Sequence, residues 1–468
     1  MDLAVIIVFV LGYFLITIEH NIKIDKLIPA LAAMAVCWAI IALNLDSIRE
    51  WFDPYTHKLV DGFASEALTI KSKYLENTLL YHLGKTAEIL VFLIGAMTIV
   101  EIIDYFNGFS VFQKIINLKT KKGILWVFSG LAFILSAIID NLTATIVLIS
   151  ILQKVVSNRN LRLWYAGIII IAANAGGAWS PIGDVTTTML WIGKKVTTPE
   201  LISYLLIPSI VCMVVSSGIA SMLPVFKGDI KLKPINDDGN KYSLRMLILG
   251  LSAIVFVPVF KIITHLPPYV GMMLALGLVS VFAEIYSNRE FALSKATAPD
   301  IDAGIDEERH HQSPVHKALT KIELPSILFF LGILMAVAAL ESIGILYNFA
   351  DQLKGLPKLG SELNASSFSD ILPIFLGVAS ALIDNVPLVA ASIGMFTVEM
   401  NDQLWHFIAY AAGTGGSMII IGSAAGVVAM GMEKINFFWY LKKISWIAFV
   451  GFIAGAGVFM IFRNFIIT

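Results

Sequence analysis

Charged residues are scarce in this sequence, making up 14% of its 468 residues, against about 25% in soluble domains. The formal net charge is -1, which gives no reason to expect a nucleic acid or a strongly charged partner. The two cysteines, Cys37 and Cys212, both lie inside apolar runs, so we expect buried side chains rather than a disulfide or a metal site. The sequence has no HExxH motif, nucleophile elbow or phosphate loop, so we expect neither an enzyme nor ATP-driven transport.

Apolar residues are abundant instead: they form 57% of the chain, and the mean hydropathy is +0.82. Segments of about 20 apolar residues are long enough to cross a hydrocarbon core as helices. The sequence therefore predicts an all-α membrane protein embedded in a lipid bilayer. We expect ten transmembrane helices, near residues 3–19, 27–44, 87–106, 163–191, 201–225, 244–264, 269–287, 323–349, 404–432 and 444–463.

Two further apolar stretches carry polar residues at their middle. The stretch 124–156 is centred on Asp140 and Asn141, and the stretch 370–400 on Asp384 and Asn385. Arms of about 15 residues give roughly 22 Å of helix, which is short for a bilayer. We therefore expect two re-entrant helical hairpins, with tips surrounded by protein or water.

The two halves of the sequence share a pattern. SAIIDN at 136–141 recurs as SALIDN at 380–385, and AANAGGAWSPIG at 172–183 is echoed by AAGTGGSMIIIG at 411–422. Both halves then read as three spans, a hairpin, a glycine-interrupted span and a last span. The sequence predicts two inverted repeats, one at 1–226 and one at 244–468, joined by a cytoplasmic linker at 227–243. Interrupted helices at matching positions of two halves indicate a transporter's binding site.

The basic residues predict an orientation. Lysines and arginines flank both ends of the first hairpin, which places those ends in the cytoplasm. The second hairpin is followed by Asn401, Asp402 and Gln403, with no basic residue, so we expect it to enter from outside. Both termini would then lie outside.

Two hydrophilic regions lie between the spans. We expect residues 46–85 to form an interfacial helix and loop. Residues 286–321 include His310, His311 and His316, which could sense pH or bind a metal. A solvated, flexible loop is the simpler interpretation of this second region.

The hairpin tips are candidate cation sites. A carboxylate at the bilayer centre costs at least roughly 2.5 kcal/mol, so such residues usually face a cavity on a transport pathway. The oxygens of Asp140, Asn141 and Thr143, with unpaired backbone carbonyls, are suitable ligands for a small cation. We predict Na+ binding at Asp140 and Asn141 and at Asp384 and Asn385. Simple capping of the second arm is the alternative, because Asp and Asn are good N-caps.

The glycine-rich stretches would supply the other wall of the site. Glycines and a proline in ANAGGAWSPIGDVTTT interrupt a helix and free carbonyls beside polar side chains. The candidates here are Asn174, Asp184, Thr186 and Thr187. The counterpart, AAGTGGSMIIIGSAAG, keeps Thr414 and Ser417 but has no carboxylate. Close packing of small residues between helices is the alternative for that second stretch.

Together, SAIIDNLTATIVL, AANAGGAWSPIGDVTTTMLW, SALIDNVPL and AAGTGGS resemble the NhaD-type sodium/proton antiporters of the ion transporter superfamily. The resemblance spans nearly the whole chain. It implies exchange of Na+ or Li+ for H+ across a bacterial inner membrane, without a cofactor. It also implies a homodimer in which a scaffold domain holds a transport domain that moves as an elevator. It assigns functional weight to Asp140, Asn141, Asn174, Asp184, Thr186, Thr187, Ser380, Asp384 and Asn385.

The dicarboxylate transporters of the same superfamily have Ser-Asn-Thr at their hairpin tips. This chain instead has Asp140 and Asp384 at the first of these positions. A fixed carboxylate at each tip would repel an anion such as citrate, so the difference favours a cation.

The expected mechanism is competition between Na+ and H+. Burial favours the protonated form of a carboxyl group, whereas a bound cation favours the ionised form. We expect Asp140, helped by Asp184 or Asp384, to release its proton when Na+ binds, so that the proton gradient drives Na+ extrusion. An arsenite or other oxyanion carrier of the superfamily and a cation channel are the alternative functions. Glu101 and Glu341, in the third span of each half, have either a structural role or a place on a proton path.

Overall fold

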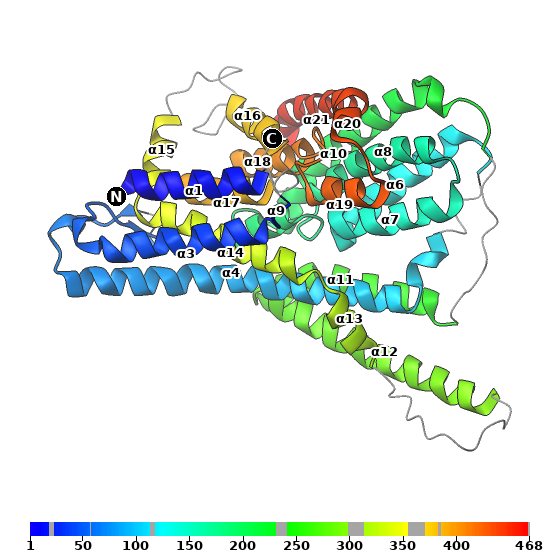
Figure 1. Cartoon of the computed structure of the whole chain (residues 1–468), viewed down its shortest axis with the longest axis horizontal. Coiled ribbons are helices and arrows are strands. Elements are labelled where there is room, and N and C mark those ends of the chain that lie inside the picture. The colour runs from blue at the N-terminus through cyan, green and yellow to red at the C-terminus, as the bar shows by residue number, and fades with distance from the viewer. Residues whose placement is uncertain are drawn as a thin grey trace. The chain divides into compact units, whose positions relative to one another are not determined.

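The computed structural model describes residues 1–17, 23–56, 58–112, 118–230, 241–297, 313–353, 370–381 and 385–466 (Figure 1). Within these residues the chain is almost entirely helical, with one small antiparallel ribbon. The helices and strands are α1 (Asp2–Thr17), α3 (Leu27–Leu43), β1 (Phe52–Asp53), β2 (Lys58–Leu59), α4 (Leu68–Tyr105), α6 (Lys121–Ile139), α7 (Asn141–Val155), α8 (Arg159–Gly177), α9 (Val185–Ile192), α10 (Thr198–Met222), α11 (Ser243–Thr264), α12 (Pro268–Thr297), α13 (Pro314–Lys321), α14 (Leu324–Ser342), α15 (Ile345–Leu353), α16 (Ile371–Ser380), α17 (Asn385–Met395), α18 (Gln403–Gly415), α19 (Ala424–Glu433), α20 (Phe437–Lys443) and α21 (Ser445–Ile466).

The chain folds into two compact units. The larger unit comprises Met1–Leu90, Leu118–Leu232 and Leu324–Thr468. The smaller unit comprises Val91–Asn117 and Lys233–Glu323, and therefore contains the end of α4 with α11, α12 and α13. All the helices that carry the predicted site residues belong to the larger unit.

The membrane character predicted from composition is confirmed. Among the residues that the structure describes, seven helices are long and apolar enough to cross a bilayer. The helices α1 and α3 are apolar but have 16 and 17 residues. The expected spans 163–191 and 404–432 each fold as two shorter helices, α8 with α9 and α18 with α19, at the positions of the glycine-rich sequences. The protein is therefore a multi-pass membrane protein, although its helices divide differently from the ten that we expected.

Several predicted boundaries are wrong. The third span begins at Leu68 rather than near residue 87, because α4 is a single helix of 38 residues. The first arm of the 124–156 stretch, α6, has 19 residues and is long enough to span a bilayer by itself. The expected span 323–349 ends at Ser342, because the turn before α15 places Gly344 at a φ of 75°, a conformation that favours glycine.

The segment before α4 folds onto the first turn of that helix. Lys71 is 1% exposed, and its ammonium group donates to the carbonyls of Asp46 at 2.9 Å and Ile48 at 3.2 Å. The ring of Phe63 covers the same ammonium group, 5.2 Å from its centroid. Because a buried ammonium group is stable only with its donors satisfied, this contact holds the ribbon and its flanks against α4.

The two halves of the sequence interlock in the larger unit. In the first half α6 packs on α7 and α8, and in the second half α16 and α17 pack on α18. The short helices cross between the halves: α19 packs on α7 and α8, and α9 packs on α17 and α18. Figure 1 shows α17, α18 and α9 grouped beside α19, α7 and α8. Each half thus completes the surroundings of the other.

The second hydrophilic region is partly helical. α12 continues to Thr297 and α13 covers Pro314–Lys321, so part of the predicted 286–321 loop is helix. His316 lies in the first turn of α13, where its amide donates to Ser313 Oγ at 3.4 Å. His310 and His311 lie outside the described residues, as does the centre of the predicted 227–243 linker.

Candidate functional site

The turn between α6 and α7 consists of a single residue, Asp140. Its backbone has φ 77° and ψ 159°, a region that non-glycine residues rarely adopt and that costs about 1 to 3 kcal/mol. Its carboxylate accepts from the Thr143 amide at 2.8 Å and from Thr143 Oγ1 at 2.9 Å. Asp140 therefore caps α7, the alternative role that the sequence left open, and Thr143 is engaged by that cap.

Glycines let the interrupted helices approach the helix pairs closely. A Cβ atom at Gly176 would overlap the carbonyl oxygen of Phe133 in α6, and one at Gly415 would overlap that of Gly377 in α16. Serine hydroxyls link the same elements: Ser136 Oγ donates to the Ala173 carbonyl at 2.6 Å, and Ser380 Oγ to the Ala412 carbonyl at 2.8 Å. These contacts hold the ends of α8 and α18 beside the turns that carry the polar residues.

Asp184 is the carboxylate at the centre of the polar cluster. It is 2% exposed and caps α9, with Oδ1 accepting from the Thr186 amide at 3.0 Å. Its Oδ2 accepts from Asn141 Nδ2 at 2.9 Å and from Asn385 Nδ2 at 3.1 Å. One carboxylate therefore binds the amide side chains that begin α7 in the first half and α17 in the second.

Asn174 extends this cluster. Its Oδ1 accepts from Asn141 Nδ2 at 3.0 Å, and its Nδ2 donates to Ser423 Oγ at 3.0 Å. Ser423 caps α19 and occupies the place in the second half that Asp184 has in the first. We name these five side chains, Asp184, Asn141, Asn174, Asn385 and Ser423, the polar core; each is at most 5% exposed.

The backbone of α18 borders the polar core. A Cβ atom at Gly413 would lie 3.8 Å from Asp184 Oδ2 and 3.2 Å from the Cβ of Ala178. Gly413 therefore brings bare backbone close to the buried carboxylate. A larger residue would fill the space beside that oxygen.

The hydroxyl groups near the polar core differ in their partners. Thr186 is fully buried, and its Oγ1 has no hydrogen-bond partner within the described residues. A buried hydroxyl without a partner is costly, so this oxygen is available to a ligand. The remaining predicted hydroxyls donate to nearby backbone carbonyls, at 2.9 Å for Thr187, 2.8 Å for Ser380, 2.6 Å for Thr414 and 2.6 Å for Ser417.

The structure thus brings Asn141, Asn174, Asp184 and Asn385 into direct contact. Asp384 lies outside the described residues, so its predicted proximity to Asp140 stays a prediction. Ser136 and Ser423 were not among the predicted site residues, although the repeat aligns them with Ser380 and Asp184. Among the described residues no group of three or more His, Cys, Asp or Glu side chains could hold a metal ion, so a cation here would need amide, hydroxyl and carbonyl oxygens beside its carboxylate.

A multi-pass helical protein with interrupted helices around a buried polar core has the architecture of a secondary transporter. The sequence matches the citrate transporter (CitMHS) family over residues 13–406. Because this match covers most of the chain, the protein belongs to that family.

The relatives are named as antiporters. The chain is 42% identical to Sodium/proton antiporter 1 of Arabidopsis thaliana over 81% of its length, spanning 63% of that protein. It is 36% identical to Sodium/proton antiporter 2 of the same plant, covering 98% of this chain and 99% of that protein. It is 29% identical to the Na(+)/H(+) antiporter NhaD of Alkalimonas amylolytica, covering 97% and 89%. The resemblance to NhaD-type proteins is therefore confirmed.

A solved structure supports the fold. The YdaH transporter of Alcanivorax borkumensis superposes with a TM-score of 0.58, covering 94% of this chain and 99% of that one, at 12% sequence identity. At this identity the likeness concerns the fold alone.

Proposed function

We propose that the protein exchanges Na+ or Li+ for H+ across its membrane, at the polar core. One observation carries the proposal: a buried carboxylate, Asp184, is held by Asn141 and Asn385 from two interlocked halves. A buried ionisable residue inside a membrane protein normally serves a transport path. The names of the relatives, sodium/proton antiporters of plants and bacteria, support the choice of ions.

The chemistry of the polar core suits competition between the two ions. Sodium is a hard cation that prefers oxygen ligands. Rotation of the Asn141 and Asn385 amides would turn their oxygens toward the cation beside Asp184, and Thr186 Oγ1 is free to join them. A proton on the Asp184 carboxylate would remove the charge that attracts the cation, so either a proton or Na+ occupies the core.

Asp140 has a supporting role in this scheme. Its oxygens cap α7 through Thr143, and that cap positions Asn141, the next residue, at Asp184. The NhaD resemblance implies that Asp140 and Asp384 also bind the cation, and this stays a prediction. Ser380, Thr187, Thr414 and Ser417 are proposed to hold the backbone that surrounds the ion.

We propose that α6 to α9 and α16 to α19 move together as the transport domain of an elevator. Support comes from the crossed packing of α9 and α19 on the opposite half, which makes independent motion of the halves costly. In this scheme α6–α7 and α16–α17 are re-entrant hairpins that enter from opposite sides. Sodium leaves the cytoplasm and protons enter, with both termini outside, as the basic residues predict.

Reconstitution tests the function directly. Purified protein in liposomes with an internal pH dye should move protons when a Na+ or Li+ gradient is imposed, and should move few with K+. In an exchanger, movement of the cation requires movement of protons in the opposite direction. A cation current that does not depend on the proton gradient would therefore indicate a channel instead. Uptake of labelled citrate or arsenite without Na+-linked proton movement would overturn the proposal in favour of an anion carrier, as the family description would suggest.

The homodimer and the bacterial inner membrane that the NhaD resemblance implies also stay predictions. Light scattering of the detergent-solubilised protein, corrected for bound detergent, should give twice the mass of one chain. A mass equal to one chain would contradict the dimer without affecting the proposed exchange.

A further inference from the structure

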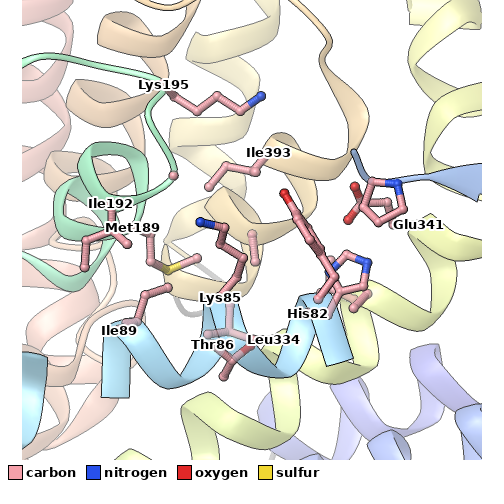
Figure 2. A pocket seen from close by; sticks show the side chains of 16 residues that line it. His82, Lys85, Thr86, Ile89, Met189, Ile192, Lys195, Leu334, Glu341 and Ile393 are labelled. Atoms are coloured by element: carbon pink, nitrogen blue, oxygen red, sulfur yellow. The ribbon is translucent and has the colours of Figure 1, made fainter. Parts of the chain in front are cut away.

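A cavity of about 150 Å³ with several titratable lining residues lies in the larger unit, apart from the polar core. Its charged and titratable lining residues are Tyr81, His82 and Lys85 of α4, Lys195 after α9, and Glu341 of α14. Figure 2 labels His82, Lys85, Lys195 and Glu341 among them. The helix α17 contributes only Ala390 and Ile393. This volume holds several water molecules, and the lining offers them polar partners.

Glu341 faces the cavity without a fixed partner for its charge. The charge of Lys195 acts on Glu341, but no nitrogen–oxygen contact of 4.0 Å or less joins the two side chains in the described part of the chain. Lys85 is paired elsewhere, 3.5 Å from Glu88. Lys195 is therefore a nearby cation with no direct contact to Glu341, and both side chains line a space large enough for water.

The neighbouring groups suit proton transfer. His82 Nε2 is buried and has no hydrogen-bond partner among the described residues, and the charge of Glu341 acts on Tyr81, as do those of Asp53 and Glu88. Lys195 is buried, with its ammonium group 4.8 Å from the centroid of the Trp405 ring. It follows the carboxyl end of α9, where the helix dipole favours a positive charge.

Two helices connect this cavity with the polar core. The helix α9 is capped by Asp184 and ends just before Lys195. The helix α17 begins with Asn385 and passes Gly394, where a Cβ atom would lie 3.0 Å from Glu341 Oε2. Both helices therefore carry a polar-core residue at one end and approach the cavity at the other.

Resting on the proposed exchange function, we infer that Glu341 is a second protonation site, which takes protons from water in this cavity and passes them to the polar core. A hydronium ion gives its proton to a Glu341 oxygen and becomes water. The protonated carboxyl then gives that proton through water to Asp184 and returns to its anionic form. In the predicted orientation this cavity opens toward the outer side, from which protons enter.

Two transport modes distinguish a proton carrier from a structural residue. Exchange of Na+ for H+ needs protonation, whereas exchange of labelled Na+ for unlabelled Na+ at equal pH does not. In proteoliposomes, Glu341→Gln should lower Na+/H+ exchange at least tenfold and keep Na+/Na+ exchange within twofold of wild type. Glu200→Gln, the same change in the first turn of α10 and away from the cavity lining, should leave both modes within twofold.

Lys195 gives a second, independent readout. Without its positive charge Glu341 should release its proton less readily, so Lys195→Gln should move the midpoint of pH activation upward by about one pH unit or more. Glu341→Gln should remove the effect of the Lys195 substitution.

Three results would overturn the inference. Unchanged Na+/H+ exchange in Glu341→Gln would exclude a role in proton transfer, and equal loss of both modes would indicate a structural role. An unchanged midpoint of pH activation in Lys195→Gln would show that Lys195 does not influence proton release from Glu341, and would overturn the inference. These results concern active wild-type protein; absence of Na+-linked proton movement in the wild type would overturn the proposed function itself.

Discussion

Asn385 donates its side-chain amide to the Asp184 carboxylate, with 3.1 Å between Nδ2 and Oδ2. The two residues begin short helices in opposite halves of the sequence. Because Asn141 binds the same oxygen from the first half, the polar core is complete only when both halves are folded together. This shared carboxylate motivates the first two predictions.

Asp184→Asn should lower the rate of Na+/H+ exchange at least a hundredfold. It should also abolish binding of labelled Na+ to the purified protein. Asparagine is also a good N-cap, so α9 should stay folded and the melting temperature should change little. Asp402→Asn is the matched control, since Asp402 caps α18 through the Leu404 amide at 2.8 Å and lies outside the polar core. Exchange by Asp184→Asn at the wild-type rate would contradict the proposal that Asp184 binds the cation.

Asn141→Ala and Asn385→Ala should each raise the Na+ concentration for half-maximal exchange about tenfold. Their effects should not add, because both amides act on one carboxylate and residues in one network are coupled by about 0.5 to 3 kcal/mol. A double-mutant cycle of apparent Na+ affinity measures the coupling. Strict additivity would show that the two amides act at separate ions.

Asp140→Gly should raise stability while lowering exchange. Glycine relieves the unfavourable backbone conformation, worth about 1 to 3 kcal/mol, and as an N-cap it costs only a few tenths of a kcal/mol. Thermal unfolding in detergent and exchange in liposomes measure the two effects. Lys434→Gly is the control: Lys434 also has a positive φ, 51°, so its replacement should stabilise the protein without loss of exchange. A lower melting temperature for Asp140→Gly than for wild type would contradict the claim that the backbone of Asp140 is strained.

Arg463 of α21 and Asp370 before α16 form a buried bidentate ion pair, at 2.7 and 2.6 Å. Asp370→Ala should destabilise the protein by about 3 to 5 kcal/mol, because it leaves a buried guanidinium without its carboxylate. Asp104→Ala removes an exposed partner, 4.0 Å from Lys321 with both side chains more than half exposed, and should cost less than about 1 kcal/mol. Equal losses of melting temperature for the two variants would show that burial of the pair does not matter.

Gly415→Ala should prevent assembly of the second half, because its Cβ would overlap the Gly377 carbonyl of α16. A backbone atom cannot move aside as a flexible side chain can. Gly457→Ala, in α21 with open space around the position, should be neutral or stabilise the helix by up to about 1 kcal/mol. Size-exclusion profiles of the two variants compare the yield of folded protein; a normal profile for Gly415→Ala would contradict the close approach.

Several parts of the fold could be predicted from residue patterns. The repeated sequences SAIIDN and SALIDN identified the polar helix pairs, and the glycine-rich stretches identified the interruptions before α9 and α19. Helix ends were less predictable. The polar side chains of residues 46–85 predicted an interfacial helix and loop, yet residues 68–85 belong to the same helix as the following span, α4, because helix propensity and tertiary contacts such as those of Lys71 override local polarity.

The sequence by itself determined the class of the protein and identified candidate site residues: a helical membrane protein with paired acidic turns and glycine-interrupted spans. These follow from local chemistry, since hydrophobic length, helix breakers and intramembrane carboxylates act through nearby residues. Only the tertiary structure decided which carboxylate lies at the centre. Asp140 and Asp184 are equivalent in type, but Asp140 turns back to cap α7 while Asp184 receives amides from both halves. That choice depends on how distant helices pack, which no local pattern encodes.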